Sequence, residues 1–299
     1  MNYESVAKPS LFGNLIPISL LIIALCCLAT GGIFVRFSEL GPVTTGFYRA
    51  LFAIPLAYFW VKLEKGTNLG NEKLSKPHFV AILGGVFLGV DLALWHTSFF
   101  MTTVANANLL ANLMPFILVP LNLILFKIAP SRLFVYGLGF ASAGLILLVG
   151  GKAEFTEKSL FGDSLALITA LFYALYLLVI GKLRAKYTAS SLMLWSSFGC
   201  ALFLLPVSII LEDTIMISSI NSLLILLSLA LFSHIGGQGL LAVALGKVDL
   251  NLSSVLVLLQ PLIAAIYAYL LFNETLTFME VAGASVILVG IYLAKKGSD

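Results

Sequence analysis

Charged residues are scarce in this sequence of 299 residues, because Asp, Glu, Lys and Arg together make up 10% of it. Soluble domains carry about 25%, so the chain lacks the polar surface that a soluble protein needs. The formal net charge of +3 is too small to indicate a polyanionic partner, which excludes a nucleic-acid binder. Hydrophobic residues make up 60% of the sequence, which excludes a disordered chain.

Cysteine is also rare. Cys26, Cys27 and Cys200 all lie within apolar runs, where small core residues are expected. The pattern excludes a secreted disulfide scaffold. It contains no spacing typical of a metal site either, so we expect neither a metal nor a cofactor.

Long apolar runs are the dominant feature of the sequence. Runs of about 18 or more residues are candidate membrane spans. They do not alternate between apolar and polar residues, and backbone groups in lipid must be hydrogen-bonded internally, so helices are predicted. The runs are Leu15–Val35, Val43–Val61, Phe79–Phe99, Val104–Phe126, Leu133–Gly150, Ser164–Gly181, Ser190–Leu211, Leu223–Leu245, Leu250–Phe272 and Phe278–Ala294. We therefore predict an all-α membrane protein of ten transmembrane helices in the lipid bilayer, with no soluble domain.

Basic residues in the loops predict the orientation in the membrane. If the N-terminus is cytoplasmic, most of the 17 basic residues fall on the cytoplasmic side. The other side then holds Arg36, Lys152 and Lys158, and Arg49 lies within a span. This asymmetry follows the positive-inside rule and predicts that both termini are cytoplasmic. The compact loops favour the cell membrane of a prokaryote. The first span, Leu15–Val35, is followed by no cleavage site and is expected to be retained.

The second half of the chain repeats the first at an offset of 146 residues. The aligned pairs include Pro115 with Pro261, Phe126 with Phe272, Gly137 with Gly283, and Gly144 with Gly290. Each copy holds five spans, and an odd number inverts the second copy relative to the first. The predicted domains are a five-helix repeat at 15–150 and an inverted five-helix repeat at 161–296. Inverted repeats are typical of secondary transporters, whose substrate site lies between the halves near the membrane midplane.

With these features in order, the sequence resembles the EamA-type members of the drug/metabolite transporter superfamily. The segments that carry the resemblance are Gly41–Val43, Phe47–Ala50, Asp91–His96, Ala105–Pro115, Ser253–Ser254, Leu259–Pro261 and Asn273–Leu276. The acidic residue that ends the family's proline-containing helix is present as Glu274 and is replaced by Ile128 in the first copy. The resemblance implies movement of a small-molecule substrate by alternating access, usually export of amino acids, related metabolites or drugs. It also implies a central cavity beside the third, fourth, eighth and ninth helices.

Asp91 is the one carboxylate deep within an apolar run. A charge at that depth is unfavourable unless it meets a partner or water. Asp91 is interpreted either as a site for a cation or a proton, or as a buried hydrogen bond that fixes the third helix. Trp95, four residues on, shares its helix face. It would add an aromatic wall to a binding site, or else pack in the core.

Amide and hydroxyl residues gather in the fourth and ninth helices near the matched prolines. They are Asn108, Asn112, Ser254 and Gln260. Because a proline leaves backbone carbonyls without donors, we expect kinks or gates at Pro115 and Pro261 and a polar cavity beside them. Hydrogen bonds between packed helices are the alternative interpretation.

Two further pairs are candidates for substrate binding. His234 and Gln238 lie four residues apart on the eighth helix, and Tyr173 and Tyr176 lie three apart on the sixth. His234 and Asp91 are expected at similar depths, so a pair between the two halves is one hypothesis. The tyrosines are interpreted as aromatic cavity wall or as core.

Arg49 and the paired glycines each have two interpretations. Arg49 lies about two turns into the second helix, where it would meet an anionic group of the substrate or, the favoured interpretation, snorkel to the outer interface with Tyr48. Small residues seven positions apart lie on one helix face and let two helices approach closely. The glycines with this spacing are Gly137 and Gly144, and Gly283 and Gly290. They would pack within the chain or form a homodimer through helices five and ten.

Two other classes of protein fit the sequence less well. An intramembrane enzyme is disfavoured, because the chain has no Gly-x-Ser-x-Gly and no His-Glu-x-x-His motif. A non-transporting membrane subunit would not explain an inverted repeat with matched prolines. The predicted function is a secondary transporter of small organic metabolites, not an enzyme.

Overall fold

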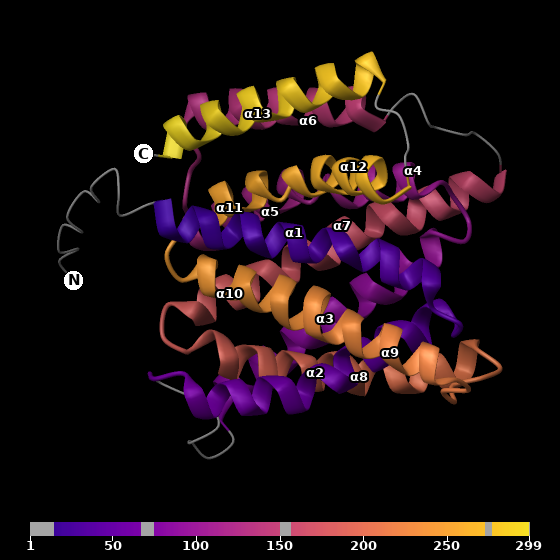
Figure 1. The fold of residues 1–299 in the computed structure, drawn as a ribbon. Coiled ribbons are helices and arrows are strands. Elements are labelled where there is room, and N and C mark those ends of the chain that lie inside the picture. The colour runs from indigo at the N-terminus through magenta and orange to yellow at the C-terminus, as the bar shows by residue number, and fades with distance from the viewer. Residues whose placement is uncertain (1–14, 67–74, 150–156, 273–276, 299) are drawn as a thin grey trace.

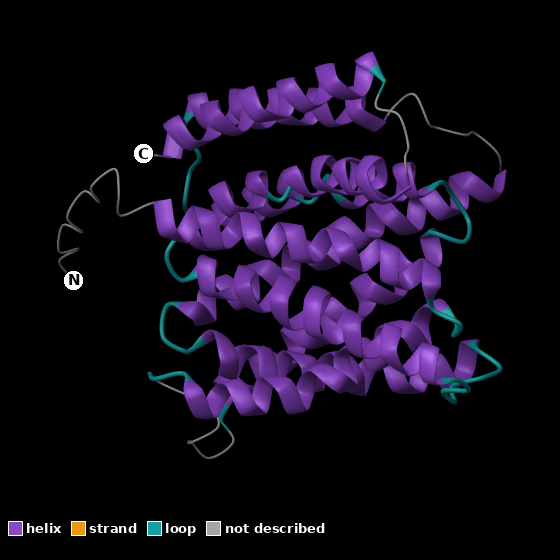
Figure 2. Cartoon of the chain, in the orientation of Figure 1, coloured by secondary structure: helices purple, strands orange, loops and turns teal. Residues whose placement is uncertain are grey.

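The computed structural model describes residues 15–66, 75–149, 157–272 and 277–298, and this part of the chain is helical without a strand (Figure 2). The expectations for Gly150, Lys152 and Glu274 concern residues outside these ranges. The first half contains α1 (Leu15–Phe37), α2 (Pro42–Leu63), α3 (Lys76–Ser98), α4 (Val104–Ala111), α5 (Pro115–Phe126) and α6 (Arg132–Val149). The second half contains α7 (Glu157–Arg184), α8 (Ala189–Leu211), α9 (Ile220–Ser228), the π-helix η3 (Leu229–Gly239), α10 (Leu240–Leu245), α11 (Leu250–Leu256), α12 (Leu259–Phe272) and α13 (Phe278–Ser298).

The described residues include nine helical segments that are long and apolar enough to cross a membrane. They correspond to all the predicted spans except the second. That span is α2, whose 22 residues suffice in length but include Arg49 and Lys62. The chain is therefore a multi-pass, all-α membrane protein, and the tenth span remains a prediction for α2.

The outer surface of the bundle is apolar, as contact with lipid requires. Large hydrophobic side chains such as Ile210, Tyr136 and Leu270 are exposed on it. Charged side chains, in contrast, lie at the ends of the long helices. Helix α7 has Glu157 in its first turn and Lys182 in its last turn, and both complement the helix dipole.

Two helix pairs form opposite edges of the molecule, α6 with α13 and α2 with α8 (Figure 1). The glutamates that follow α2 and α8 link the second pair at its ends. The carboxylate of Glu212, after α8, accepts hydrogen bonds from Val43 N (2.7 Å) and Thr44 N (2.9 Å) at the start of α2. Glu64, after α2, accepts one from Ser190 N (2.8 Å) at the start of α8. Each helix therefore begins where the other ends, so α2 and α8 are antiparallel.

Glycines bring α6 and α13 into backbone contact. A β-carbon at Gly144 would lie 2.5 Å from Ile287 N and 2.7 Å from Gly283 O. A β-carbon at Gly283 would lie 2.5 Å from Leu148 N. These glycines therefore pack within the chain, which is one of the two interpretations of their spacing. A homodimer through the outer faces of α6 and α13 remains a prediction.

Replacing Gly144 with Ala is expected to lower the melting temperature of the purified protein, because the new methyl group meets the backbone of α13. Overpacking of this kind costs about 1–3 kcal/mol. Gly139→Ala is the matched control on α6, since no atom lies within 4 Å of a β-carbon there. The measurement is thermal unfolding followed by tryptophan fluorescence. Equal melting temperatures for the two variants would contradict the close contact.

Candidate functional site

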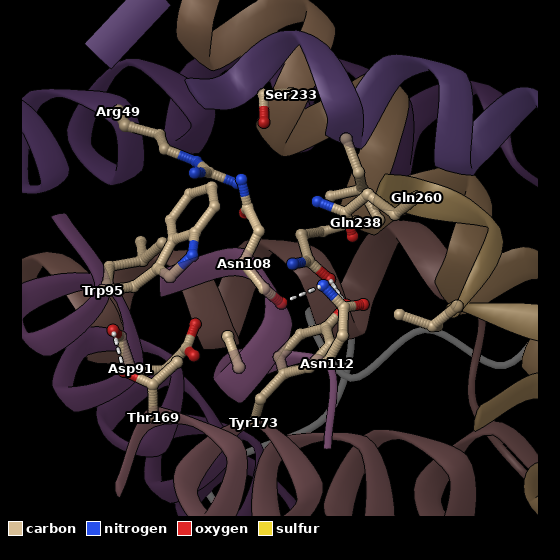
Figure 3. Close-up of a pocket in the computed structure, with 14 residues that line it drawn as sticks. Arg49, Asp91, Trp95, Asn108, Asn112, Thr169, Tyr173, Ser233, Gln238 and Gln260 are labelled. Atoms are coloured by element: carbon tan, nitrogen blue, oxygen red, sulfur yellow. Dashed lines mark hydrogen bonds between the residues drawn. The ribbon is translucent and has the colours of Figure 1, made fainter. Parts of the chain in front are cut away.

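A cavity of about 50 Å³ lies between helices of both halves of the chain (Figure 3). The first half contributes Leu28, Arg49, Asp91, Leu92, Trp95, Asn108, Ala111 and Asn112. The second half contributes Thr169, Tyr173, Ser233, Gln238, Val257 and Gln260. The edge helices α6 and α13 contribute none of these residues. A space of this size holds a few water molecules, so a larger solute requires the lining helices to move apart.

Two of the lining helices are interrupted beside the cavity, each just before a proline. The fourth predicted span divides into α4 and α5 at residues 112–114, and α5 begins at Pro115. The ninth divides into α11 and α12 at residues 257–258, and α12 begins at Leu259, two residues before the buried Pro261. At both breaks the backbone changes from i→i+4 to i→i+3 hydrogen bonds. Examples are Leu113 N to Leu110 O (3.1 Å) and Leu258 N to Val255 O (3.1 Å).

The amides at these breaks line the cavity. Asn112 donates from Nδ2 to the backbone oxygen of Asn108 (2.7 Å), which also accepts from Asn112 N (3.0 Å). The Asn108 side chain is directed toward Arg49, and Gln260 lies on the far side of the cavity (Figure 3). Ser254 lies outside the lining, because its hydroxyl donates to Asn251 O (2.6 Å) within its own helix.

Asp91 lies at the bottom of the cavity in the view of Figure 3, beside Trp95. It is 6% exposed. Its backbone oxygen accepts a hydrogen bond from Thr169 Oγ1 (3.4 Å), but within the described ranges its carboxyl group has no hydrogen-bond partner. The interpretation that the carboxyl group fixes α3 by a buried hydrogen bond therefore has no support in the structure. Trp95 packs on Phe99 at 4.6 Å between ring centroids and also reaches the cavity.

The π-helix changes which residues of the eighth predicted span face the cavity. Residues five apart lie one above the other in a π-helix, whereas residues four apart do so in an α-helix. Ser233 and Gln238 consequently line the cavity together. His234 turns away from it, and its Nε2 lies 3.0 Å from Ser197 Oγ of α8. The hypothesis of an Asp91–His234 pair is therefore wrong for this structure.

Arg49 reaches the cavity instead of the outer interface. Its side chain is 2% exposed, so the snorkelling interpretation is wrong. The first turns of α2 are covered by neighbouring helices, and residues Val43–Phe47 are buried. Tyr48, on another face of the helix, extends outward and donates from its hydroxyl to Ile215 O (2.8 Å). Arg49 thus points inward, a placement that depends on packing against α8 and that its position in the sequence does not reveal.

The two tyrosines of α7 separate in the structure. The Tyr173 hydroxyl lies at the cavity and donates to Gln238 Oε1 (3.4 Å). Tyr176 is buried outside the lining, with its hydroxyl 3.8 Å from Met193 Sδ. Their rings are 6.1 Å apart and nearly parallel, so Tyr176 supports the Tyr173 ring from behind.

Metal-binding clusters are absent from the described residues, where no group of three or more His, Cys, Asp or Glu side chains could hold an ion. The cavity wall offers a guanidinium, a carboxyl group, four side-chain amides, two aliphatic hydroxyl groups and two aromatic rings.

Comparison with known proteins identifies the family to which this chain belongs. The model of the EamA-like transporter family matches residues 15–150 and 160–295. The chain belongs to the EamA-like transporter family. It is a membrane transporter, as members of that family are.

Individual relatives of this EamA-like transporter cover much of the chain. An "Uncharacterized transporter" of Archaeoglobus fulgidus is 28% identical over 91% of this chain and 96% of its own length. A "Probable amino-acid metabolite efflux pump" of Salmonella typhimurium is 26% identical over 62% of this chain and 66% of its own length. A solved crystal structure shares the fold with a TM-score of 0.78 and 16% identity, over 94% of this chain and 97% of that chain.

The two tyrosines of α7 provide a test of the cavity in this EamA-like transporter. Tyr173→Phe removes a hydroxyl from the cavity wall and is expected to lower solute flux about 2- to 10-fold, the loss that corresponds to one hydrogen bond. Tyr176→Phe, the matched control, removes a hydroxyl outside the lining and should leave flux unchanged. Both are measured in proteoliposomes at equal protein content. Equal losses would mean that the hydroxyl at the cavity has no special part in transport.

Proposed function

We propose that this transporter exports small organic metabolites, with amino acids and related solutes as the substrate class, by alternating access. The two halves of the chain would rock about the cavity between them and open it first to the cytoplasm and then to the outside. The proposal includes inverted five-helix repeats at 15–150 and 161–296, with both termini in the cytoplasm and the protein in the cell membrane.

The observation that carries the proposal is a polar cavity between the halves, inside an apolar bundle. Polar side chains within a membrane span are unfavourable unless they face water or a partner. Here Arg49, Asp91, Asn108, Gln238 and Gln260 converge on one small space from five different segments of the chain. A cavity at the junction of two repeats is where secondary transporters bind their solutes.

Irregular backbone next to the cavity supports movement there. The two proline breaks and the π-helix all border it. Non-helical backbone at membrane depth is tolerated where it is buried in protein or lines a cavity. Segments with interrupted hydrogen-bond ladders bend more easily than continuous helices, so these three places are suited to act as hinges.

The names of two relatives support the substrate class. The Salmonella protein is named as an amino-acid metabolite efflux pump, and an Escherichia coli protein of the same name is 26% identical over 52% of this chain. We extend to this chain both the solute class and the outward direction that these names state.

Solute flux in proteoliposomes tests the proposal, with a panel of amino acids and nucleosides and with or without a pH gradient. The wild-type protein is expected to move an amino acid. Asp91→Asn should lower that flux at least about tenfold, because hydrogen bonds to charged groups contribute about 1.5–3 kcal/mol. Asp213→Asn, in the exposed segment after α8, is the charge-matched control. Flux that needs the gradient would further assign proton coupling to the transporter.

Two results would count against the proposal. Undiminished flux in Asp91→Asn would remove Asp91 from the transport site. An absence of flux for every amino acid, together with flux of a nucleoside, would keep the transporter and replace its substrate class.

A further inference from the structure

Arg49 is a buried cation whose contacts within the protein are incomplete. Its Nε and Nη1 atoms are buried and have no hydrogen-bond partner among the described residues. An arginine side chain in a protein does not lose its proton. A buried, unpaired charge is strongly unfavourable. An anion that binds reversibly at this side chain would neutralise it.

Ser233 presents a second unsatisfied donor to the same cavity. It is 1% exposed, lines the cavity from η3, and its Oγ has no hydrogen-bond partner within the described ranges. A β-carbon at Gly31 would lie 2.7 Å from Ser233 Oγ and 3.8 Å from Arg49 Nη1. Because Gly31 of α1 has no β-carbon, it leaves space for the side chains of Ser233 and Arg49. Figure 3 shows Arg49 and Ser233 on the same side of the cavity, with the Asn108 side chain opposite them.

Asp91 lies on the other side of the cavity and does not pair with Arg49. No hydrogen bond or ion pair between the two side chains is present in the described residues. In the view of Figure 3, Trp95 lies between them. A direct contact would neutralise both groups. Their separation within one cavity leaves an unpaired cation and an unpaired carboxyl group on the wall.

We propose that Arg49 and Ser233 bind the carboxylate of an α-amino acid and that Asp91 binds its ammonium group. Arginine recognises carboxylates through two parallel hydrogen bonds, and the serine hydroxyl adds a third donor. The inference rests on the proposed function, which it refines from a class of metabolites to the free, zwitterionic amino acid. The solute side chain would lie against the rings of Trp95 and Tyr173.

The test compares solutes that differ by one charged group. The twenty protein amino acids are the probes, and the one with the highest flux is compared with its decarboxylated amine and its deaminated acid. In wild-type proteoliposomes, both analogues are expected to move at least about tenfold more slowly than the amino acid. Arg49→Gln should abolish the preference for the amino acid over the amine. Asp91→Asn should abolish the preference over the deaminated acid.

Two further variants separate binding from folding. Arg36→Gln removes an exposed arginine at the end of α1 and should leave both preferences unchanged. Arg49→Lys keeps the charge without the planar fork, so it should retain part of the preference. In the absence of solute, Arg49→Gln should melt no lower than wild type, because the substitution removes an unpaired buried charge. The amino acid should raise the melting temperature of wild type and not that of Arg49→Gln.

Several results would overturn this inference. If the wild-type protein moves the amine as fast as the amino acid, the carboxylate is not recognised, although the proposed transport of amino-acid metabolites would stand. If Arg49→Gln melts lower and slows every solute equally, Arg49 has a structural role. If chloride, tested against gluconate, protects wild type as well as the amino acid does and the two do not compete, Arg49 binds an inorganic anion only.

Discussion

Lipid offers no water to a buried charge, and this constraint governs the arrangement around Arg49 and Asp91. Each side chain lies deep in an apolar bundle, and neither is neutralised by the other. The protein meets the constraint with a small polar cavity, in which water or a solute completes the contacts that the chain leaves open. The rest of the structure serves to hold that cavity between two halves. The pairs at the edges, α2 with α8 and α6 with α13, join the halves. Of these four helices, α2 reaches the cavity through Arg49, and α6, α8 and α13 contribute no lining residue.

Departures from regular helix are concentrated where the cavity needs them. The breaks before Pro115 and Pro261 place amides at the wall, and the π-helix turns Ser233 and Gln238 toward the same space. At the two breaks the backbone changes to i→i+3 hydrogen bonds, and the carbonyl of Asn108 accepts a second hydrogen bond from the Asn112 side chain. The edge helices α6 and α13, in contrast, are continuous and packed through glycines. Irregular backbone is thus found beside the cavity and not at the edge formed by α6 and α13.

Much of this arrangement follows from the sequence, because its causes are local. Apolar runs predict spans, and prolines predict breaks. Asp91 is conspicuous because a carboxylate deep in a span is rare. Other features depend on packing between distant segments. Arg49 points inward because α8 covers the start of α2, and no pattern within α2 records that. A regular α-helix would place His234 on the same face as Gln238, but in the π-helix Ser233 takes that position. A change of helical phase by one residue leaves no clear trace in an apolar sequence.

Cysteine accessibility from the two sides of the membrane tests whether the cavity between the halves is the solute pathway. A single cysteine in place of Asn108, in a protein whose Cys26, Cys27 and Cys200 are replaced, would be labelled with a membrane-impermeant maleimide in vesicles of each orientation. We expect labelling from both sides of the membrane, and we expect the transported amino acid to slow it on both sides. Labelling from one side only, unaffected by any solute, would contradict it.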